Sequence, residues 1–127
     1  MKNFGRPLVL ILSALILGLT PASQAGPADR YAAIAYSPEL NRWGWGTNYA
    51  TQAEAIARAL KECGRNDATT SWCRNAWIAL AISDKTPGGF GTAWGATPDA
   101  AREAARRECL ARNPDARIVA CVSAYGD

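Results

Sequence analysis

The sequence contains no histidine, which removes the side chain that most often serves as a general base or a metal ligand near neutral pH. Its cysteines also lack the Cys-x-x-Cys spacing of a zinc site. The glycine-rich segments 44–46 and 88–91 lack both the spacing and the Lys-Ser/Thr ending of a phosphate-binding loop. The sequence therefore predicts neither a metal ion nor any other cofactor.

Catalysis would have to rely on carboxylates, because histidine is absent and the cysteines are expected to be paired. The candidates are Asp84, Glu62 and Glu108. Asp84 belongs to a turn-forming run, and Glu62 follows Arg58 by four positions, which suits an ion pair on a helix. We therefore name no catalytic residue.

The chain also lacks an apolar run long enough to span a membrane. The run Leu8–Leu19 has about a dozen residues, whereas a spanning helix needs about twenty. Lys2 and Arg6 precede this run, and small residues follow it up to Ala25. This pattern predicts a secretory signal peptide over residues 1–25, cleaved after Ala25. We expect a secreted or periplasmic protein with no membrane span after cleavage.

A strong charge of either sign is missing as well. Loss of Lys2 and Arg6 lowers the number of basic residues from 14 to 12, against 11 acidic residues, so the net charge falls from +3 to about +1. Nucleic acid is therefore not expected as a partner. The arginines of segment 102–112 are interspersed with glutamates, which indicates a solvated helix face rather than an anion-binding site.

The chain does contain an internal duplication with an offset of forty-six positions. The two units cover about residues 31–73 and 77–121. The aligned segments are Tyr31–Ser37 with Trp77–Ser83, Gly44–Thr47 with Gly89–Thr92, and Glu62-Cys63 with Glu108-Cys109. Both units lie in residues 26–127, which have the size of one small domain.

Each unit has the pattern of a β-hairpin followed by a helix. Thr51 and Glu54 form a capping box, and Gly64 suits the end of that helix. In the second unit Thr97 precedes Pro98 at the first helical position. Segment 117–123 is predicted as a final strand. The predicted fold is α+β with the order ββαββαβ, in which one mainly antiparallel sheet carries both helices on one face.

Alternation along the strands separates two kinds of side chain. Ile78, Leu80 and Ile82 point to one side, and Ala79 and Ala81 between them point to the other. We expect the aliphatic side to lie under the helices and the alanine side to be half-open. Gly44 and Gly46 would let a helix approach the sheet closely.

Aromatic residues are the candidate binding groups on the half-open face. The proposed binding residues are Trp43, Trp45, Tyr31 and Trp77. Exposed tryptophan and tyrosine in an apolar patch are typical of recognition surfaces, which suggests a protein partner. The alternative interpretation is that these side chains complete the core of a small domain.

Four cysteines in an exported chain of this size indicate disulfides. Four cysteines allow three connectivities. The duplication favours Cys63 with Cys73 and Cys109 with Cys121, and each bond would contribute about 3 kcal/mol in the chain-entropy model. A zinc site formed by these residues is the alternative, and the lack of histidine disfavours it.

The segment Tyr31–Ser37, the Trp-Gly-x-Gly strand at 43–46, the helix ending at Cys63 and the block Trp72-Cys73-Arg-Asn closely resemble the bacterial domain-of-unknown-function family 4189. The resemblance covers essentially all of the chain after residue 25. It implies a small exported protein with an accessory or recognition role, and it supplies no catalytic residue.

These observations favour an exported, disulfide-stabilised binding module, such as an inhibitor or an immunity protein of the cell envelope. The first alternative is a carboxylate-dependent cell-wall hydrolase, which requires two carboxylates about 5 to 9 Å apart in one cleft. The second is a structural envelope protein that associates with itself through exposed aromatic residues.

Overall fold

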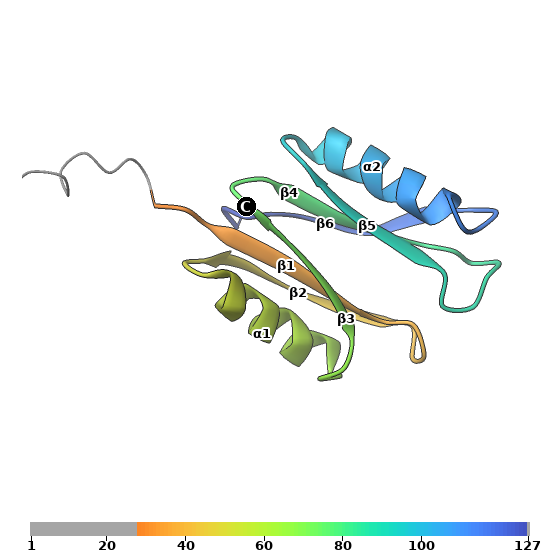
Figure 1. Ribbon diagram of the computed structural model, residues 1–127, viewed down its shortest axis with the longest axis horizontal. Helices are drawn as coiled ribbons and strands as arrows, with labels where there is room; N and C mark the ends of the chain where they lie inside the picture. The colour runs from red at the N-terminus through yellow and green to blue at the C-terminus, as the bar shows by residue number, and fades with distance from the viewer. Residues whose placement is uncertain (1–27, 127) are drawn as a thin grey trace, which may run out of the picture.

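The computed structural model describes residues 28–126, which form six strands and two helices (Figure 1). In chain order these are β1 (Tyr31–Ser37), β2 (Arg42–Tyr49), α1 (Gln52–Cys63), β3 (Thr69–Arg74), β4 (Trp77–Ile82), β5 (Phe90–Gly95), α2 (Pro98–Leu110) and β6 (Arg117–Ser123). The predicted signal peptide over residues 1–25 lies outside the described residues.

The strands form two antiparallel sheets of three strands each, with the orders β2-β1-β3 and β5-β4-β6. The α+β class and the two helices agree with the sequence prediction, but the single sheet was wrong. Each unit has a strand after its helix, so the repeat is ββαβ and the order is ββαβββαβ; the sequence predicted this strand in the second unit, as β6, but not in the first. The unpredicted strand is β3, which completes the sheet of the first unit, so that each unit forms a sheet of its own.

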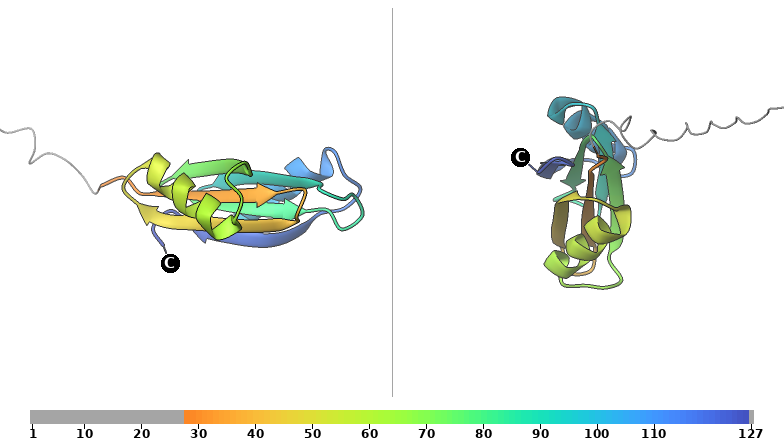
Figure 2. Two further views of the ribbon diagram at one scale, coloured as in Figure 1. Left: turned by 90° about the horizontal axis from the view of Figure 1, so that it is seen from below. Right: turned by 90° about the vertical axis from the view of Figure 1, so that its left-hand side faces the viewer.

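The two sheets pack face to face, and the helices cover the outer sides (Figures 1 and 2). In this four-layer arrangement β1 lies over β4, β2 over β6, and β3 over β5. The sandwich therefore has two long edges, one formed by β2 and β6 and the other by β3 and β5.

The faces of the strands are used in the opposite way to the sequence prediction. The bulky side chains Ile34, Tyr36 and Leu80 fill the space between the two sheets. The alanine faces lie under the helices, where Ala33 and Ala79 are completely buried. No half-open alanine face exists among residues 28–126, because the second sheet covers one side of each sheet and a helix covers the other.

Glycines on β2 and β5 allow the helices to lie close to the sheets. A Cβ atom at Gly46 would lie 2.7 Å from the carbonyl oxygen of Ala55, and one at Gly44 would collide with the backbone nitrogen of Cys63. Gly91 takes the same position against Cys109 in the second unit. The expectation that Gly44 and Gly46 let a helix approach the sheet closely is confirmed. Because the helices lie this close, the space beneath them accepts only small side chains such as alanine.

Both helices begin as predicted. The hydroxyl of Thr51 accepts a hydrogen bond from the backbone N–H of Glu54 at 3.1 Å, and Thr97 accepts one from Ala100 at 3.1 Å. Gly64 ends α1 in the left-handed conformation, with φ of 87°. The threonine caps thus fix where each helix starts on its sheet.

The four cysteines are free thiols, so the predicted disulfides were wrong. Cys63 lies between α1 and its sheet, whereas Cys73 lies between the two sheets, and the backbone of the sheet separates them. Cys109 lies near the carbonyl of Asp115, and Cys121 near the carbonyl of Pro98 at the other end of α2. Eleven residues of helix separate these ends by about 16 Å, far beyond disulfide reach.

Candidate functional site

The four aromatic residues proposed as a binding face are divided between different layers. Trp43 and Trp45 lie on the β2 residues that pair with Tyr36 and Ile34, so they belong to the side between the sheets. Tyr31 and Trp77 pack instead against the alanine clusters under the helices. Trp43 is half-buried against the core, whereas Trp45 is 43% exposed.

Trp45 is the centre of a surface that we call the Trp45 edge. It borders three shallow hollows of about 240, 280 and 300 Å³ along the β2/β6 edge. Their other lining residues are Trp43, Gly44, Gly46, Thr47, Tyr49, Arg58, Glu62, Trp77, Cys121, Val122, Ser123 and Gly126. The structure therefore brings Trp43, Trp45 and Trp77 to one edge and places Tyr31 elsewhere.

A larger hollow of about 500 Å³ lies on the opposite edge, formed by β3 and β5. Trp72, Cys73, Arg74 and Trp94 line it, and we call it the Trp72–Trp94 groove. The two tryptophans are among the most exposed apolar side chains in the described part of the chain, at 42% for Trp72 and 64% for Trp94. Exposed apolar patches of this kind are candidates for interaction surfaces.

Sequence reasoning missed this groove because it placed no strand at residues 69–74. The available signal was the run Thr69–Arg74, which contains two threonines and a tryptophan and lies between two turns. Trp94 belonged to a predicted strand, but the duplication offered no second tryptophan at the matching position of the first unit.

The face of β3 explains how Trp72 and Arg74 are displayed. In the register with β1, Trp72 pairs with Ala33 and Arg74 pairs with Tyr31, so both lie on the side of the sheet that carries α1. The helix covers mainly β1 and β2 and leaves both side chains exposed. The ring of Tyr31 supports Trp72 at a centroid distance of 6.0 Å.

The inner side of the groove comes from the space between the sheets. Cys73 and Trp94 lie on that side, because they pair with the core positions Ala32 and Ile78. Burial raises the pKa of the Cys73 thiol to about 11, so the thiol stays protonated at neutral pH. Next to it, the hydroxyls of Ser71 and Thr92 share a hydrogen bond of 2.6 Å that joins β3 to β5.

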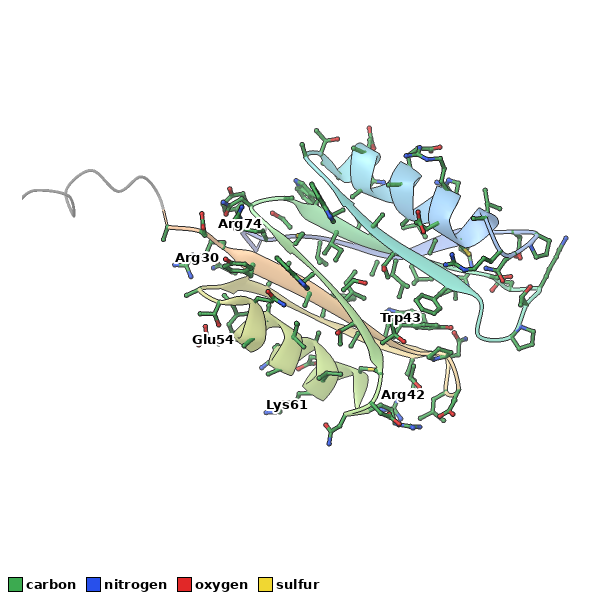
Figure 3. The ribbon with its side chains drawn as sticks, in the orientation of Figure 1. Arg30, Arg42, Trp43, Glu54, Lys61 and Arg74 are labelled. Carbon is green, nitrogen blue, oxygen red and sulfur yellow. The ribbon has the colours of Figure 1, made fainter. Side chains whose placement is uncertain are left out.

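Among residues 28–126, Arg74 is the one charged residue that lines the groove. Its guanidinium lies 3.9 Å from the carboxylate of Asp29, and both side chains are exposed. Asp29 also accepts a hydrogen bond of 2.9 Å from the side chain of Asn75. Arg30 lies at the same end of the first sheet, whereas Trp43 lies towards the opposite end of that sheet (Figure 3). The loose contact with Asp29 leaves Arg74 available to an anionic group.

The candidate carboxylate Asp84 and its neighbour Asp115 have structural partners. Asp84 accepts two hydrogen bonds of 2.9 Å from Arg117, which lower the pKa of its carboxyl group. Asp115, which the sequence did not single out, accepts hydrogen bonds from the Ser83 hydroxyl and the backbone N–H of Asp84, and its pKa is lowered too. A lowered pKa keeps both groups ionised near neutral pH, so neither is suited to donate a proton.

The other two candidate carboxylates lie on the helices. Glu62 forms an ion pair of 2.9 Å with Arg58, as the spacing predicted, and Glu108 is exposed near the end of α2. Arginines of α2 also have acidic neighbours: Arg102 lies 2.6 Å from Asp99. This pairing suits a solvated helix surface.

Within residues 28–126, no group of three or more histidine, cysteine, aspartate or glutamate side chains is placed to hold a metal ion. In the same part of the chain, neither helix has the length and apolar character needed to cross a membrane.

The fold and its edges define a duplicated four-layer sandwich with an aromatic groove between two edge strands. Residues 31–123 match the family described as "Domain of unknown function (DUF4189)", and the chain belongs to this family. The family identified from the sequence motifs is thereby confirmed.

Curated relatives with similar sequences come from mycobacteria. Protein Rv1269c of Mycobacterium tuberculosis and Protein Mb1300c of Mycobacterium bovis are each 41% identical over 68 residues. The match covers 53% of this chain and 54% of each relative, so the chain spans about half the length of the curated relatives it matches. No solved structure matches the chain.

Proposed function

We propose that this protein is an exported binding module that holds part of a protein partner in the Trp72–Trp94 groove. The sequence pattern of residues 1–25 supports export. We propose that this binding inhibits an enzyme or toxin of the cell envelope, as an inhibitor or an immunity protein does.

The observation that carries the proposal is the meeting of two exposed tryptophans and a loosely paired arginine around a hollow of about 500 Å³. Tryptophan and arginine are the residue types most enriched among the energetic centres of protein interfaces. Both tryptophans stand on strands of the sandwich, so a partner meets them already held in place. A preorganised surface of this kind loses less entropy when it binds.

No specific observation favours the hydrolase or the self-associating envelope protein. For the hydrolase, the neighbouring acids Asp84 and Asp115 both have a lowered pKa and are engaged in contacts that hold a loop. The Trp45 edge remains a separate binding hypothesis, because its exposed tryptophan lies on the other long edge.

Affinity purification from the native cell envelope tests the proposal. The wild-type protein is compared with Trp94→Ala, Trp45→Ala and Leu110→Ala. Leu110 is the matched control, because it is 45% exposed near the end of α2 and lines neither edge. We expect Trp94→Ala to lose a partner that Leu110→Ala retains.

Circular dichroism first establishes that each variant is folded. If Trp94→Ala retains every partner of the wild-type protein, the Trp72–Trp94 groove is not the binding site. Loss of the partner from Trp45→Ala alone would assign the function to the Trp45 edge.

A further inference from the structure

We propose that β3 binds an extended peptide segment as an additional antiparallel strand, and that this segment carries an acidic residue two positions before an aromatic residue. This inference rests on the proposed function, because it names the part of the partner that the groove would accept.

The free edge of β3 is the first observation. β3 ends the strand order β2-β1-β3, and its pairing within the described residues is with β1 alone. An edge strand presents a row of backbone N–H and C=O groups to which another chain can add. In this type of recognition, backbone hydrogen bonds provide affinity and alternate side chains provide specificity.

The outer face of β3 determines the side chains that a bound strand would need. Trp72 and Arg74 are two positions apart and therefore share one face, which α1 leaves exposed. Directly opposite residues in antiparallel strands favour aromatic pairs and pairs of opposite charge. An antiparallel strand would thus place an aromatic residue opposite Trp72 and an acidic residue opposite Arg74. Because the bound strand runs antiparallel to β3, its acidic residue precedes its aromatic residue in the sequence, with one residue between the two.

The intervening residue of the bound segment would point to the other face of the sheet. There it would lie opposite Cys73, on the side of the groove where Trp94 stands. Because the Cys73 thiol is buried and neutral, this position suits an apolar side chain such as valine. The groove therefore predicts a three-residue pattern in which acidic, apolar and aromatic residues follow one another.

The equivalent strand of the second unit lacks these features. On β6, Cys121 and Ser123 pair with Ala79 and Trp77, so they occupy the positions of Trp72 and Arg74. The chain after β6 also crosses to β2, where the backbone N–H of Asn48 donates to the carbonyl of Ala124 at 3.0 Å. The β2/β6 edge is thus joined at one end, and β6 has neither the aromatic ring nor the cation that would select the segment.

The neighbouring strand β5 is a less suitable acceptor. Gly95 lies on the helix side of β5, and a Cβ atom added there would lie 2.8 Å from the backbone nitrogen of Ala101 on α2. The helix therefore lies directly over β5, and side chains on that face of an added strand would meet it. On β3, by contrast, α1 leaves the outer side chains Trp72 and Arg74 exposed.

A capped peptide, acetyl-Lys-Thr-Val-Glu-Val-Phe-Val-Thr-Lys-amide, serves as the probe, and isothermal titration calorimetry with the purified protein measures its affinity. We expect binding to weaken more than tenfold in Trp72→Ala, as for a central aromatic contact. Arg74→Gln should weaken binding by about threefold to fivefold, as for an exposed ion pair. With glutamine in place of the peptide glutamate, Arg74→Gln should make no difference.

Two further peptides test strand addition itself. Each carries N-methyl groups on alternate residues, and the two peptides differ in which edge of the extended chain is blocked. We expect one to lose binding and the other to retain it, because the hydrogen bonds to β3 come from a single edge. Circular dichroism of Trp72→Ala and Arg74→Gln confirms that each is folded.

Three results would each overturn the inference. The two methylated peptides could bind equally well, the parent peptide could fail to bind, or Arg74→Gln could weaken binding of the glutamate and glutamine peptides by the same factor. These results leave the proposed function standing if Trp94→Ala still loses its natural partner. Conversely, if the natural partner binds Trp94→Ala as well as it binds the wild-type protein, the proposed function itself is wrong.

Discussion

Replacing Ala79 with leucine is expected to destabilise the protein by about 3 kcal/mol, at the upper end of the usual cost of overpacking a core. Ala79 lies at the centre of β4, is completely buried, and packs in a cluster with Ala101, Ala105 and Cys109 of α2. The larger side chain has no free volume to occupy, because Ala79 is completely buried and Gly91, which pairs with the same-face residue Ala81, lets α2 lie in close contact with the sheet. The helix must therefore move outward, or the leucine must adopt a strained rotamer.

Denaturation with urea, followed by circular dichroism, measures this change. For a folded part of about 100 residues, 3 kcal/mol corresponds to a fall in Tm of roughly 12 to 24 °C. Ala57→Leu is the matched control, because Ala57 is exposed on α1, where the same substitution should change stability by less than about 0.5 kcal/mol. The slope of the urea transition should stay unchanged.

If Ala79→Leu were as stable as the wild-type protein, the alanine face of the sheet would be open, as the sequence alone suggested. That result would refute the placement of α2 over this face of the sheet. An equal loss of stability in Ala57→Leu would also refute the reasoning, because the cost would then not depend on burial.

Two more predictions concern the thiols and the acidic residues. Mass spectrometry of the unfolded protein with an alkylating reagent and no reductant should show four modified cysteines, and two or none would contradict the free thiols. The hydrogen bond from Ser83 lowers the pKa of the Asp115 carboxyl group in the folded protein. The contact therefore stabilises the fold at pH values above the ordinary aspartate pKa, and this stabilisation is lost as the pH falls through the lower pKa of the folded state. Asp115→Asn should therefore lose less stability on acidification than the wild-type protein, as measured by urea denaturation from pH 6 to pH 2, and an equal loss in both would contradict the assignment.

Local features of the fold were predictable where the signal lies in neighbouring residues. The threonine caps, the glycine end of α1 and the two hairpins depend on contacts within a few positions, and the structure confirms them. The close approach of α1 at Gly44 and Gly46 was predictable too, because only the absence of a Cβ atom permits it.

The candidate site was predicted less well, because it depends on pairing between distant parts of the chain. Trp72 and Trp94 meet only because β3 and β5 lie over each other in different sheets. Among the proposed residues, Trp43, Trp45 and Trp77 do border one edge, but Tyr31 lies elsewhere, because alternation along a strand does not tell which edge a side chain reaches.

The sequence by itself determined the duplication, the family, the class of fold and the positions of both helices, because periodicity and capping are local properties. Tertiary structure decided what covers each face of a strand. Alternation separates alanine from isoleucine and leucine, but it does not say whether a helix or a second sheet covers the bulky side. Because the second sheet covers the bulky side and α1 covers the alanine side, Cys63 and Cys73 lie on opposite sides of a sheet. Trp72 and Arg74 remain exposed beside the free edge of β3.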